Sequence, residues 1–339
     1  MAVATREQYD EMLDRAKKNH FAYPAINVTS SQTASAALAG LAEAESDGIL
    51  QVSVGGAEYW SGSTIKDRVA GSIAFTEYVR AVADKYDITV ALHTDHCAKQ
   101  NIDSWIRPLM ELEAEQHKAG KETYFNSHMW DGSSVPLDEN LEIAKELLEL
   151  SVKANTILEI EIGVVGGEED GIVGEINEKL YTTAADGLKT VEALGTGENG
   201  RYTTALTFGN VHGVYKPGHV KLRPEILEDI QQEVGQKIGK ERPFDLVFHG
   251  GSGSSAEEIA TAVKAGVVKM NIDTDTQYAF TRPVAGWMYQ NFDGVLKIDG
   301  EVGNKKVYDP RSWGKAAEAG MSARVIEYAK QLGSAGNKM

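Results

Sequence analysis

The chain has 339 residues, of which 42% are hydrophobic and 25% are charged, and its formal net charge is −16. These proportions are typical of a globular protein. The negative charge argues against binding to nucleic acid, which normally requires a basic surface. No run approaches the roughly 20 consecutive apolar residues of a membrane-spanning helix, so we expect neither a nucleic-acid nor a membrane partner.

The amino-terminal segment and the cysteine content indicate a cytoplasmic location. The opening stretch MAVATREQYDEMLDRAKKNH lacks the apolar core of a signal peptide and has the spacing of an amphipathic helix. Cys97 is the single cysteine, so the chain can form no intrachain disulfide. This is consistent with a reducing compartment.

Eight short runs rich in Val, Ile and Leu predict β-strands. In chain order they are YPAINV (23–28), GILQVSV (48–54), ITVALHTD (88–95), TYFNSHMWD (123–131), TILEIEIG (156–163), TALTFGNV (204–211), DLVFHG (245–250) and VVKMNID (267–273). Helical patterns lie between them at 32–46, 67–85, 137–153, 224–238 and 256–265. Apolar strands that alternate with helices predict a covered parallel sheet. Eight such units favour a TIM (β/α)8 barrel over an open doubly wound sheet.

Two segments exceed a minimal barrel. One is the Gly- and acid-rich stretch 163–190 after the fifth predicted strand, and the other is the tail after residue 292, with a helix expected near 311–332. Segments of this length usually form lids, binding loops or interfaces. We therefore expect residues 1–339 to form a single α/β barrel domain with an extended loop after strand 5 and a C-terminal helical extension.

Five of the eight histidines fall at the carboxyl ends of predicted strands, where a TIM barrel carries its active site. They are His93, His96, His128, His212 and His249, and Asp95, Asp131, Glu159 and Glu161 accompany them. Any one of these histidines could be an interior hydrogen-bonded residue, and we expect His93 and His128 to support the site or pack beside it. As a group at one end of the barrel, the imidazoles predict a divalent-metal site that suits zinc.

Glycines follow two of these histidines, in VHGVYKPG and HGGSGSS. Backbone N–H groups in such turns, together with a helix N-terminus just beyond Ser255, can bind an anion. Taken alone, GGSGS is as often a flexible loop. Its position after the seventh strand favours phosphate, because the loops after strands 7 and 8 are the usual phosphate site of these barrels. A metal beside a phosphate suits a phosphorylated ketone or alcohol as substrate.

Seven segments in this order resemble class II, metal-dependent fructose-bisphosphate aldolases of the longer type. They are ALHTDHC, SHMWDGS, LEIEIGVVGGEEDG, FGNVHGVYKPG, FHGGSGS, VKMNIDTDTQYAFTRP and KKVYDPRSW, and the resemblance runs from about Tyr9 to about residue 330. It implies a lyase that reversibly cleaves fructose 1,6-bisphosphate to dihydroxyacetone phosphate and glyceraldehyde 3-phosphate through a zinc-stabilised enediolate, in glycolysis and gluconeogenesis. A homodimer or homotetramer is also implied.

The resemblance further implies roles for individual residues. The zinc ligands would be His96, His212 and His249, with Asp131 and Glu161 at positions that can bind a second or displaced metal. The catalytic group would contain Asp95 as acid/base, Glu169 for proton transfer at the dihydroxyacetone-phosphate carbon, and Asn271. The phosphate pocket of that half of the substrate would contain Gly213, Gly250, Ser252, Asn271, Asp273 and Thr274. The rest of the bisphosphate would meet Asn27, Ser53 and Arg311. Backbone carbonyls near Val211, Gly213, Gly250 and Ser252 would hold K⁺ or Na⁺.

Several alternatives remain open at this point. The same chemistry could act on tagatose 1,6-bisphosphate, because stereospecificity does not follow from residue types. The HTDH motif could belong to a metal-dependent barrel hydrolase, and Lys269 could be the nucleophile of a Schiff-base aldolase. The chain could also be a non-catalytic metal- or phosphate-binding protein. Arg311 lies far along the chain from the strand ends, so it could serve a neighbouring subunit's pocket.

Overall fold

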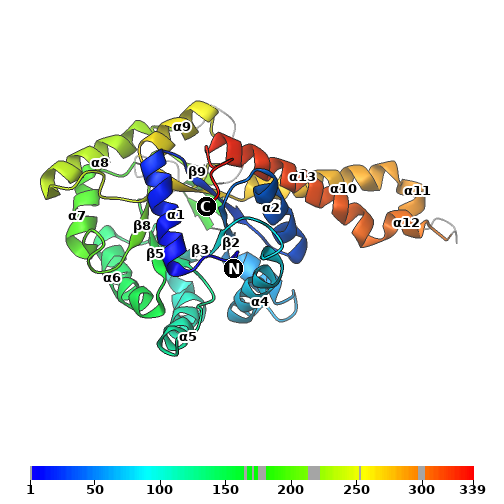
Figure 1. Cartoon of the computed structure of the whole chain (residues 1–339), viewed down its shortest axis with the longest axis horizontal. Helices are drawn as coiled ribbons and strands as arrows, with labels where there is room; N and C mark the ends of the chain where they lie inside the picture. The colour runs from blue at the N-terminus through cyan, green and yellow to red at the C-terminus, as the bar shows by residue number, and fades with distance from the viewer. Residues whose placement is uncertain are drawn as a thin grey trace.

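Eight parallel strands close into a barrel in the order β1-β11-β10-β8-β5-β4-β3-β2 (Figure 1). The computed structural model describes residues 2–163, 166–169, 172–174, 181–212, 222–251, 253–296 and 302–339. The barrel strands are β1 (Tyr23–Asn27), β2 (Gly48–Val52), β3 (Val90–Ala98), β4 (Ser127–Asp131), β5 (Ile157–Ile162), β8 (Tyr202–Leu206), β10 (Leu246–Phe248) and β11 (Val267–Ile272). The TIM barrel predicted from the alternation of apolar runs and helices is confirmed.

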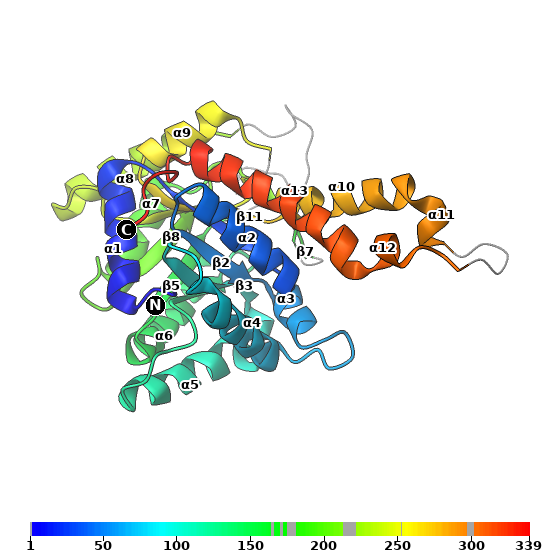
Figure 2. The ribbon, with the colours of Figure 1, turned by 45° about the vertical axis from the view of Figure 1, so that its right-hand side comes forward.

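Helices follow the strands and cover the outside of the barrel (Figures 1 and 2). They are α2 (Ser31–Glu43), α3 (Val54–Trp60), α4 (Arg68–Ala83), the 3₁₀ helix η1 (Lys99–Ser104), α5 (Ile106–Lys118), α6 (Leu137–Ala154), α7 (Ala184–Leu194), α8 (Glu225–Ile238) and α9 (Ala256–Lys264). Ser30 and Ser255 cap α2 and α9, because each hydroxyl accepts a hydrogen bond from a first-turn N–H that has no partner within the helix. No helix in the described part of the chain is both long and apolar enough to span a membrane.

The amino-terminal end of the barrel is closed by α1 (Arg6–Asn19). Tyr9, Met12 and Leu13 of this helix are buried, and they form one cluster with residues from the starts of the strands, namely Tyr23, Ala25, Ile49, Ala91, Ile157 and Val268. Arg201, just before β8, donates to Asp10 and Asp14 of α1 and holds the helix in place. Because α1 fills this end, the carboxyl ends of the strands are the end of the barrel where an active site is expected.

The C-terminal extension consists of α10 (Thr274–Gln290), α11 (Phe292–Val295), α12 (Lys305–Tyr308) and α13 (Pro310–Gln331). In both views α10 and the first half of α13 lie side by side and project away from the barrel (Figures 1 and 2). A Cβ added at Gly40 would lie 2.7 Å from the carbonyl oxygen of Ser322, and one at Gly320 would lie 2.5 Å from that of Ala279. Glycine at these two positions therefore lets α13 pack closely against α2 and α10.

Several strands are a few residues shorter than predicted, and one predicted strand is interrupted. We expected a single strand over 204–211, but β8 ends at Leu206, and Val211–His212 form β9 in a separate sheet. The Asn210 side chain accepts from the N–H of Phe208, and Gly209 has a φ of +95°, so a tight turn interrupts the strand. β9 pairs in parallel with β6 (Gly166–Glu169), which pairs with β7 (Ile172–Gly174). The extended segment expected after strand 5 thus contains two short strands.

Candidate active site

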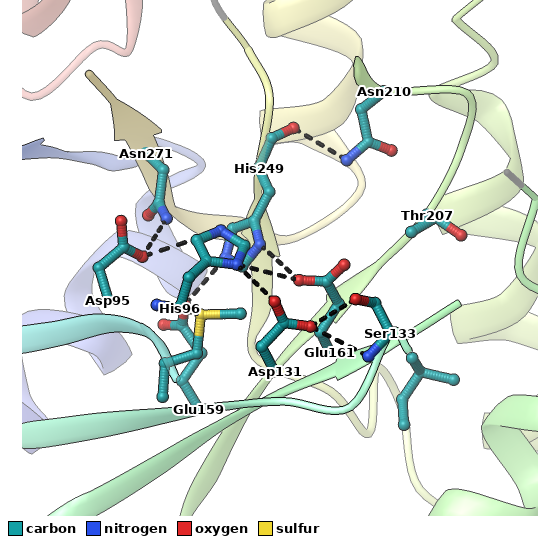
Figure 3. A network of polar contacts seen from close by, with 12 residues as sticks. Asp95, His96, Asp131, Ser133, Glu159, Glu161, Thr207, Asn210, His249 and Asn271 are labelled. Carbon is teal, nitrogen blue, oxygen red and sulfur yellow. Dashed lines mark hydrogen bonds and ion pairs between the residues drawn. The ribbon is translucent and has the colours of Figure 1, made fainter. Parts of the chain in front are cut away.

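Adjacent residues of β3, Asp95 and His96, both turn their side chains into the mouth of the barrel (Figure 3). In a regular strand, neighbouring side chains point to opposite faces. Here the pairing of β3 with β4 shifts between Thr94 and Cys97, and His96 has a φ of +39°. The result is a β-bulge, which brings a carboxylate and an imidazole to the same place.

His249 follows β10 directly and is fully buried. Its Nδ1 lies 3.2 Å from Glu161 and its Nε2 lies 2.9 Å from Glu159. Burial alone would lower the pKa of His249, but the two carboxylates hold it above its usual value. The backbone oxygen of His249 accepts a hydrogen bond of 2.8 Å from the Asn210 side chain (Figure 3). The turn after β8 therefore holds the backbone of His249 in place.

The imidazole rings of His96 and His249 are 4.7 Å apart between centroids. The Nδ1 of His96 lies 3.2 Å from Asp131 and 3.7 Å from Glu161. Burial alone would raise the pKa of Asp131, but hydrogen bonds with His96 and Ser133 hold it well below its usual range. Ligand atoms of two sets, Asp95–His96–His249 and His96–Asp131–Glu161, lie within 4.8 Å of one another. These imidazole and carboxylate donors fit a divalent transition metal.

The carboxylate of Asp95 is held at both oxygens. Asn27 of β1 donates to Oδ2 at 2.9 Å, and Asn271 of β11 donates to Oδ1 at 2.8 Å. Gln51 of β2 donates in turn to the Asn27 side chain at 2.7 Å. Each oxygen keeps further acceptor capacity, because a carboxylate oxygen has two lone pairs. The arrangement fixes the plane of the carboxylate and leaves it able to accept a proton.

A buried ion pair that the sequence analysis did not predict lies beneath the histidines. The Nζ of Lys269 lies 2.9 Å from each carboxylate oxygen of Glu159, and both side chains are buried. Burial alone would raise the pKa of Glu159, but the Lys269 ammonium and His93 hold it well below its usual value. A Schiff-base nucleophile must be a neutral amine that reaches the substrate. Lys269 is instead enclosed and held by this ion pair.

His93 and His128 lie beside this centre. The Nδ1 of His93 lies 2.7 Å from the Ser127 hydroxyl, and burial followed by the Lys269 ammonium lowers the pKa of His93 to about 4. The Nε2 of His128 lies 2.7 Å from Glu113 of α5, between the strands and the helices. His93 and His128 are thus held by their own hydrogen bonds, next to the centre formed by His96 and His249.

The remaining predicted site residues are placed less centrally. Ser53 caps α3 by accepting from Gly56, Asp273 and Thr274 begin α10, and Gly250, with a φ of +63°, follows His249. Val211 and His212 in β9, and Glu169 in β6, are described by their backbone pairing alone. Gly213 and Ser252 lie outside the described residues.

Arg311 lies at the start of α13, where its exposed guanidinium pairs with Asp309 at 2.6 Å. It lines a cleft of about 870 Å³ together with Thr29, Ser30 and Tyr59, among others. The lining therefore includes Thr29, two residues after Asn27, and residues of α10 and α13. The structure brings Asn27, Asp95, His96, Asp131, Glu161, His249 and Asn271 together in one centre, and it places Arg311 in this adjoining cleft.

Comparisons with known proteins agree with this geometry. The family described as fructose-bisphosphate aldolase class-II matches residues 7–337. The chain is similar to the fructose-bisphosphate aldolase of Streptomyces galbus, with 62% identity over 339 residues and full coverage of both chains. That of Mycobacterium tuberculosis (strain H37Rv) is 60% identical over 342 residues, which cover 100% of this chain and 99% of the relative. The crystal structure of fructose-bisphosphate aldolase from Campylobacter jejuni has a TM-score of 0.87 and 38% identity, and it covers 100% of this chain and 97% of its own.

Proposed function

This chain belongs to the class-II fructose-bisphosphate aldolase family, and we propose here how its residues carry out the reaction of that family. It is a lyase that reversibly cleaves fructose 1,6-bisphosphate to dihydroxyacetone phosphate and glyceraldehyde 3-phosphate, a step of glycolysis and gluconeogenesis. The family is metal-dependent. The tagatose, hydrolase and non-catalytic alternatives receive no support from the family or the relatives.

The metal that we propose is zinc, held by His96, His212 and His249, with Asp131 and Glu161 able to bind it in a displaced position. The convergence of His96 and His249 with three carboxylates carries this proposal, because imidazole nitrogens are preferred zinc ligands. When bound, the ion supplies Lewis-acid stabilisation of the negative charge that develops on the substrate's C2 oxygen.

Asp95 is the residue that we assign to the first proton transfer. Cleavage between C3 and C4 requires the C4 hydroxyl to lose its proton as the C4 carbonyl forms, and Asp95 accepts that proton. Its two amide partners, Asn27 and Asn271, hold the acceptor in a fixed orientation at the barrel mouth, which general-base catalysis requires.

Glu169 is assigned to the second transfer, in which C3 of the three-carbon fragment is protonated. It lies on β6, whose residue Gly167 pairs with His212 of β9. The segment that carries the proton donor therefore runs beside the segment that carries a proposed metal ligand. Both segments lie in the sheet that follows the fifth and sixth strands of the barrel.

The phosphates and a monovalent cation complete the proposal. We assign the dihydroxyacetone-phosphate half to Gly213, Gly250, Ser252, Asn271, Asp273 and Thr274, and the other half to Asn27, Ser53 and Arg311. K⁺ or Na⁺ would bind the carbonyls of Val211, Gly213, Gly250 and Ser252. The left-handed backbone at Gly250 supports this assignment, since it turns the chain directly after a metal ligand.

We propose a homodimer or homotetramer of one-domain subunits, each comprising residues 1–339, located in the cytoplasm. The projecting segment supports association, because several large apolar side chains on its helices and between them are exposed, namely Tyr278, Tyr289, Phe292, Leu296 and Val302. Arg311 lies in the first turn of α13, within the projecting part of the chain, so association of subunits could bring it to a neighbouring subunit's site. The burial of Cys97 is consistent with the location.

Cleavage of fructose 1,6-bisphosphate, measured as dihydroxyacetone phosphate released, tests the proposed site. Treatment with EDTA should abolish activity and added zinc should restore it, whereas EDTA preloaded with calcium serves as the control. Activity that survives complete removal of metal would contradict the histidine site. Borohydride trapping of a substrate adduct would then identify Lys269 as the nucleophile. Tagatose 1,6-bisphosphate, assayed in parallel, measures stereospecificity.

A further inference from the structure

The carboxyl end of β3 departs from regular strand geometry at the place where it carries two site residues. Thr94 is paired with His128, and Cys97 is paired with Trp130, so β3 advances three residues while β4 advances two. The extra residue produces the bulge, and His96 takes a φ of +39°. Such a backbone is strained for a residue with a Cβ, and it persists only where the surrounding structure holds it.

The bulge also changes the hydrogen bond made by the backbone N–H of His96. This N–H donates to the thioether sulfur of Met129 at 3.2 Å. Met129 is fully buried on β4, where it is paired with Glu159 of β5. A buried N–H without an acceptor is strongly disfavoured. The sulfur therefore stabilises the displaced backbone directly at the proposed metal ligand.

A second set of contacts holds β3 on the other face, immediately before the bulge. The hydroxyl of Thr94 lies 2.9 Å from Nδ1 of His128, and Nε2 of His128 lies 2.7 Å from Glu113 of α5. The other oxygen of Glu113 accepts from the N–H of Phe125 at 2.8 Å. Thr94, His128 and Glu113 are all fully buried. A continuous chain of hydrogen bonds thus ties the start of the bulge to β4 and to α5.

These two sets of contacts enclose Asp95 and His96. The hydrogen bonds through His128 and Glu113 hold Thr94, the residue before Asp95. The Met129 sulfur holds the backbone N–H of His96. We propose that Met129 and the chain Thr94–His128–Glu113 are positioning residues, which hold the β3 bulge and thereby set the orientation of the Asp95 carboxylate and the His96 imidazole. None of the four is assigned a contact with substrate. The inference deepens the proposed function, because it depends on the roles assigned there to Asp95 and His96.

Two mild substitutions test the proposal. Met129→Leu keeps the volume and removes the sulfur acceptor, whereas Thr94→Val keeps the shape and removes the hydroxyl. Met12→Leu is the matched control, because Met12 is equally buried but lies in the plug at the opposite end of the barrel. Both test variants should bind zinc roughly 10–100-fold more weakly, in line with the loss of groups that orient metal ligands. They should also lower kcat with little change in KM.

The absorption spectrum of the cobalt(II)-loaded protein provides a readout that a general loss of stability would not move. We expect Met129→Leu and Thr94→Val to shift the visible bands, and Met12→Leu to leave them unchanged. Zinc affinity and cobalt spectra that match the wild type in both test variants would overturn the proposal, even if the variants were less stable.

Hydrogen exchange of the metal-free protein separates this inference from the proposed function. The amides of residues 94–97 should exchange faster in both test variants than in the wild type and in Met12→Leu. This comparison does not depend on activity. Faster exchange in a protein without metal-dependent cleavage would refute the proposed function and leave the role of Met129 in holding the bulge intact. Unchanged exchange in an active enzyme would refute the inference alone.

Discussion

Replacing Lys269 by methionine should destabilise the protein by about 3–5 kcal/mol, the usual effect of removing one partner of a buried ion pair. The Nζ of Lys269 lies 2.9 Å from both oxygens of Glu159, and both side chains are buried. Without the ammonium, the Glu159 carboxylate would remain enclosed, with His93, His249 and the Thr203 hydroxyl as its remaining partners. Glu159→Gln should destabilise by a similar amount, because it leaves the ammonium buried without its anion.

The double variant Lys269→Met/Glu159→Gln removes both charges and preserves the volumes. We expect its free energy of unfolding to lie within about 1–2 kcal/mol of the wild type, because replacing a whole buried pair is often nearly neutral. Its zinc affinity should nevertheless fall, since Glu159 lies 2.9 Å from the Nε2 of His249 and helps to orient that ring.

Urea denaturation of the four metal-free proteins gives the cycle of free energies. The exposed pair Lys189–Asp138, with an N–O distance of 2.9 Å, provides the matched control, and its removal should have little effect. If the two single effects at Glu159 and Lys269 simply add to give the double effect, the two groups are not energetically linked. Single effects below about 1 kcal/mol would likewise refute the buried-pair argument.

Three further predictions concern the site, the closed end of the barrel and the extension. Asp95→Asn should lower kcat by roughly 10²–10⁴-fold with a smaller effect on KM, because the amide cannot accept the proton, and a steady-state assay with unchanged kcat would remove Asp95 from the mechanism. Burial opposes ionisation of Asp245, but Lys17 and Arg201 hold its pKa below the usual 3.8. The Asp245 carboxylate therefore contributes its full stabilisation above the unfolded-state pKa of 3.8. This stabilisation is lost as the pH falls through the lower pKa of the folded state. The thermal midpoint of the wild type should therefore fall more steeply below pH 4 than that of Asp245→Asn, and parallel curves would contradict this account. Gly40→Ala should destabilise by about 1–3 kcal/mol through overpacking against α13, since the added Cβ would lie 2.7 Å from a backbone oxygen, and calorimetry showing no loss would mean that the two helices separate freely.

The barrel could be predicted because its signals are local. Each apolar run and each amphipathic helical pattern is visible within its own segment, and parallel topology then follows from their alternation. The histidine and carboxylate centre could be predicted for the same reason, since barrels place strand ends together. His96, Asp131, Glu161 and His249 meet as the sequence analysis expected.

Features that depend on distant partners were not predicted. The bulge at His96 depends on the pairing of β3 with β4. The break after Leu206 is local, but the turn at Gly209 lies within a run that has the composition of a single strand. The orientation of Lys269 depends on a second register shift, between β10 and β11, near Val268. Strand periodicity contains no information about such shifts, so the ion pair with Glu159 could not be inferred from spacing alone.

The ion pair inside the barrel has a consequence for how the chain finds its native alignment. A strand displaced by one residue presents the opposite set of side chains to the interior. If β11 paired with its neighbouring strands one residue out of register, Lys269 would enter the apolar layer between strands and helices. Glu159 would then be left enclosed without the ammonium group. Apolar residues tolerate many arrangements of similar volume, whereas an ammonium 2.9 Å from a carboxylate exists in one alignment of these strands. We therefore expect misaligned barrels to reopen during refolding rather than to persist as trapped forms.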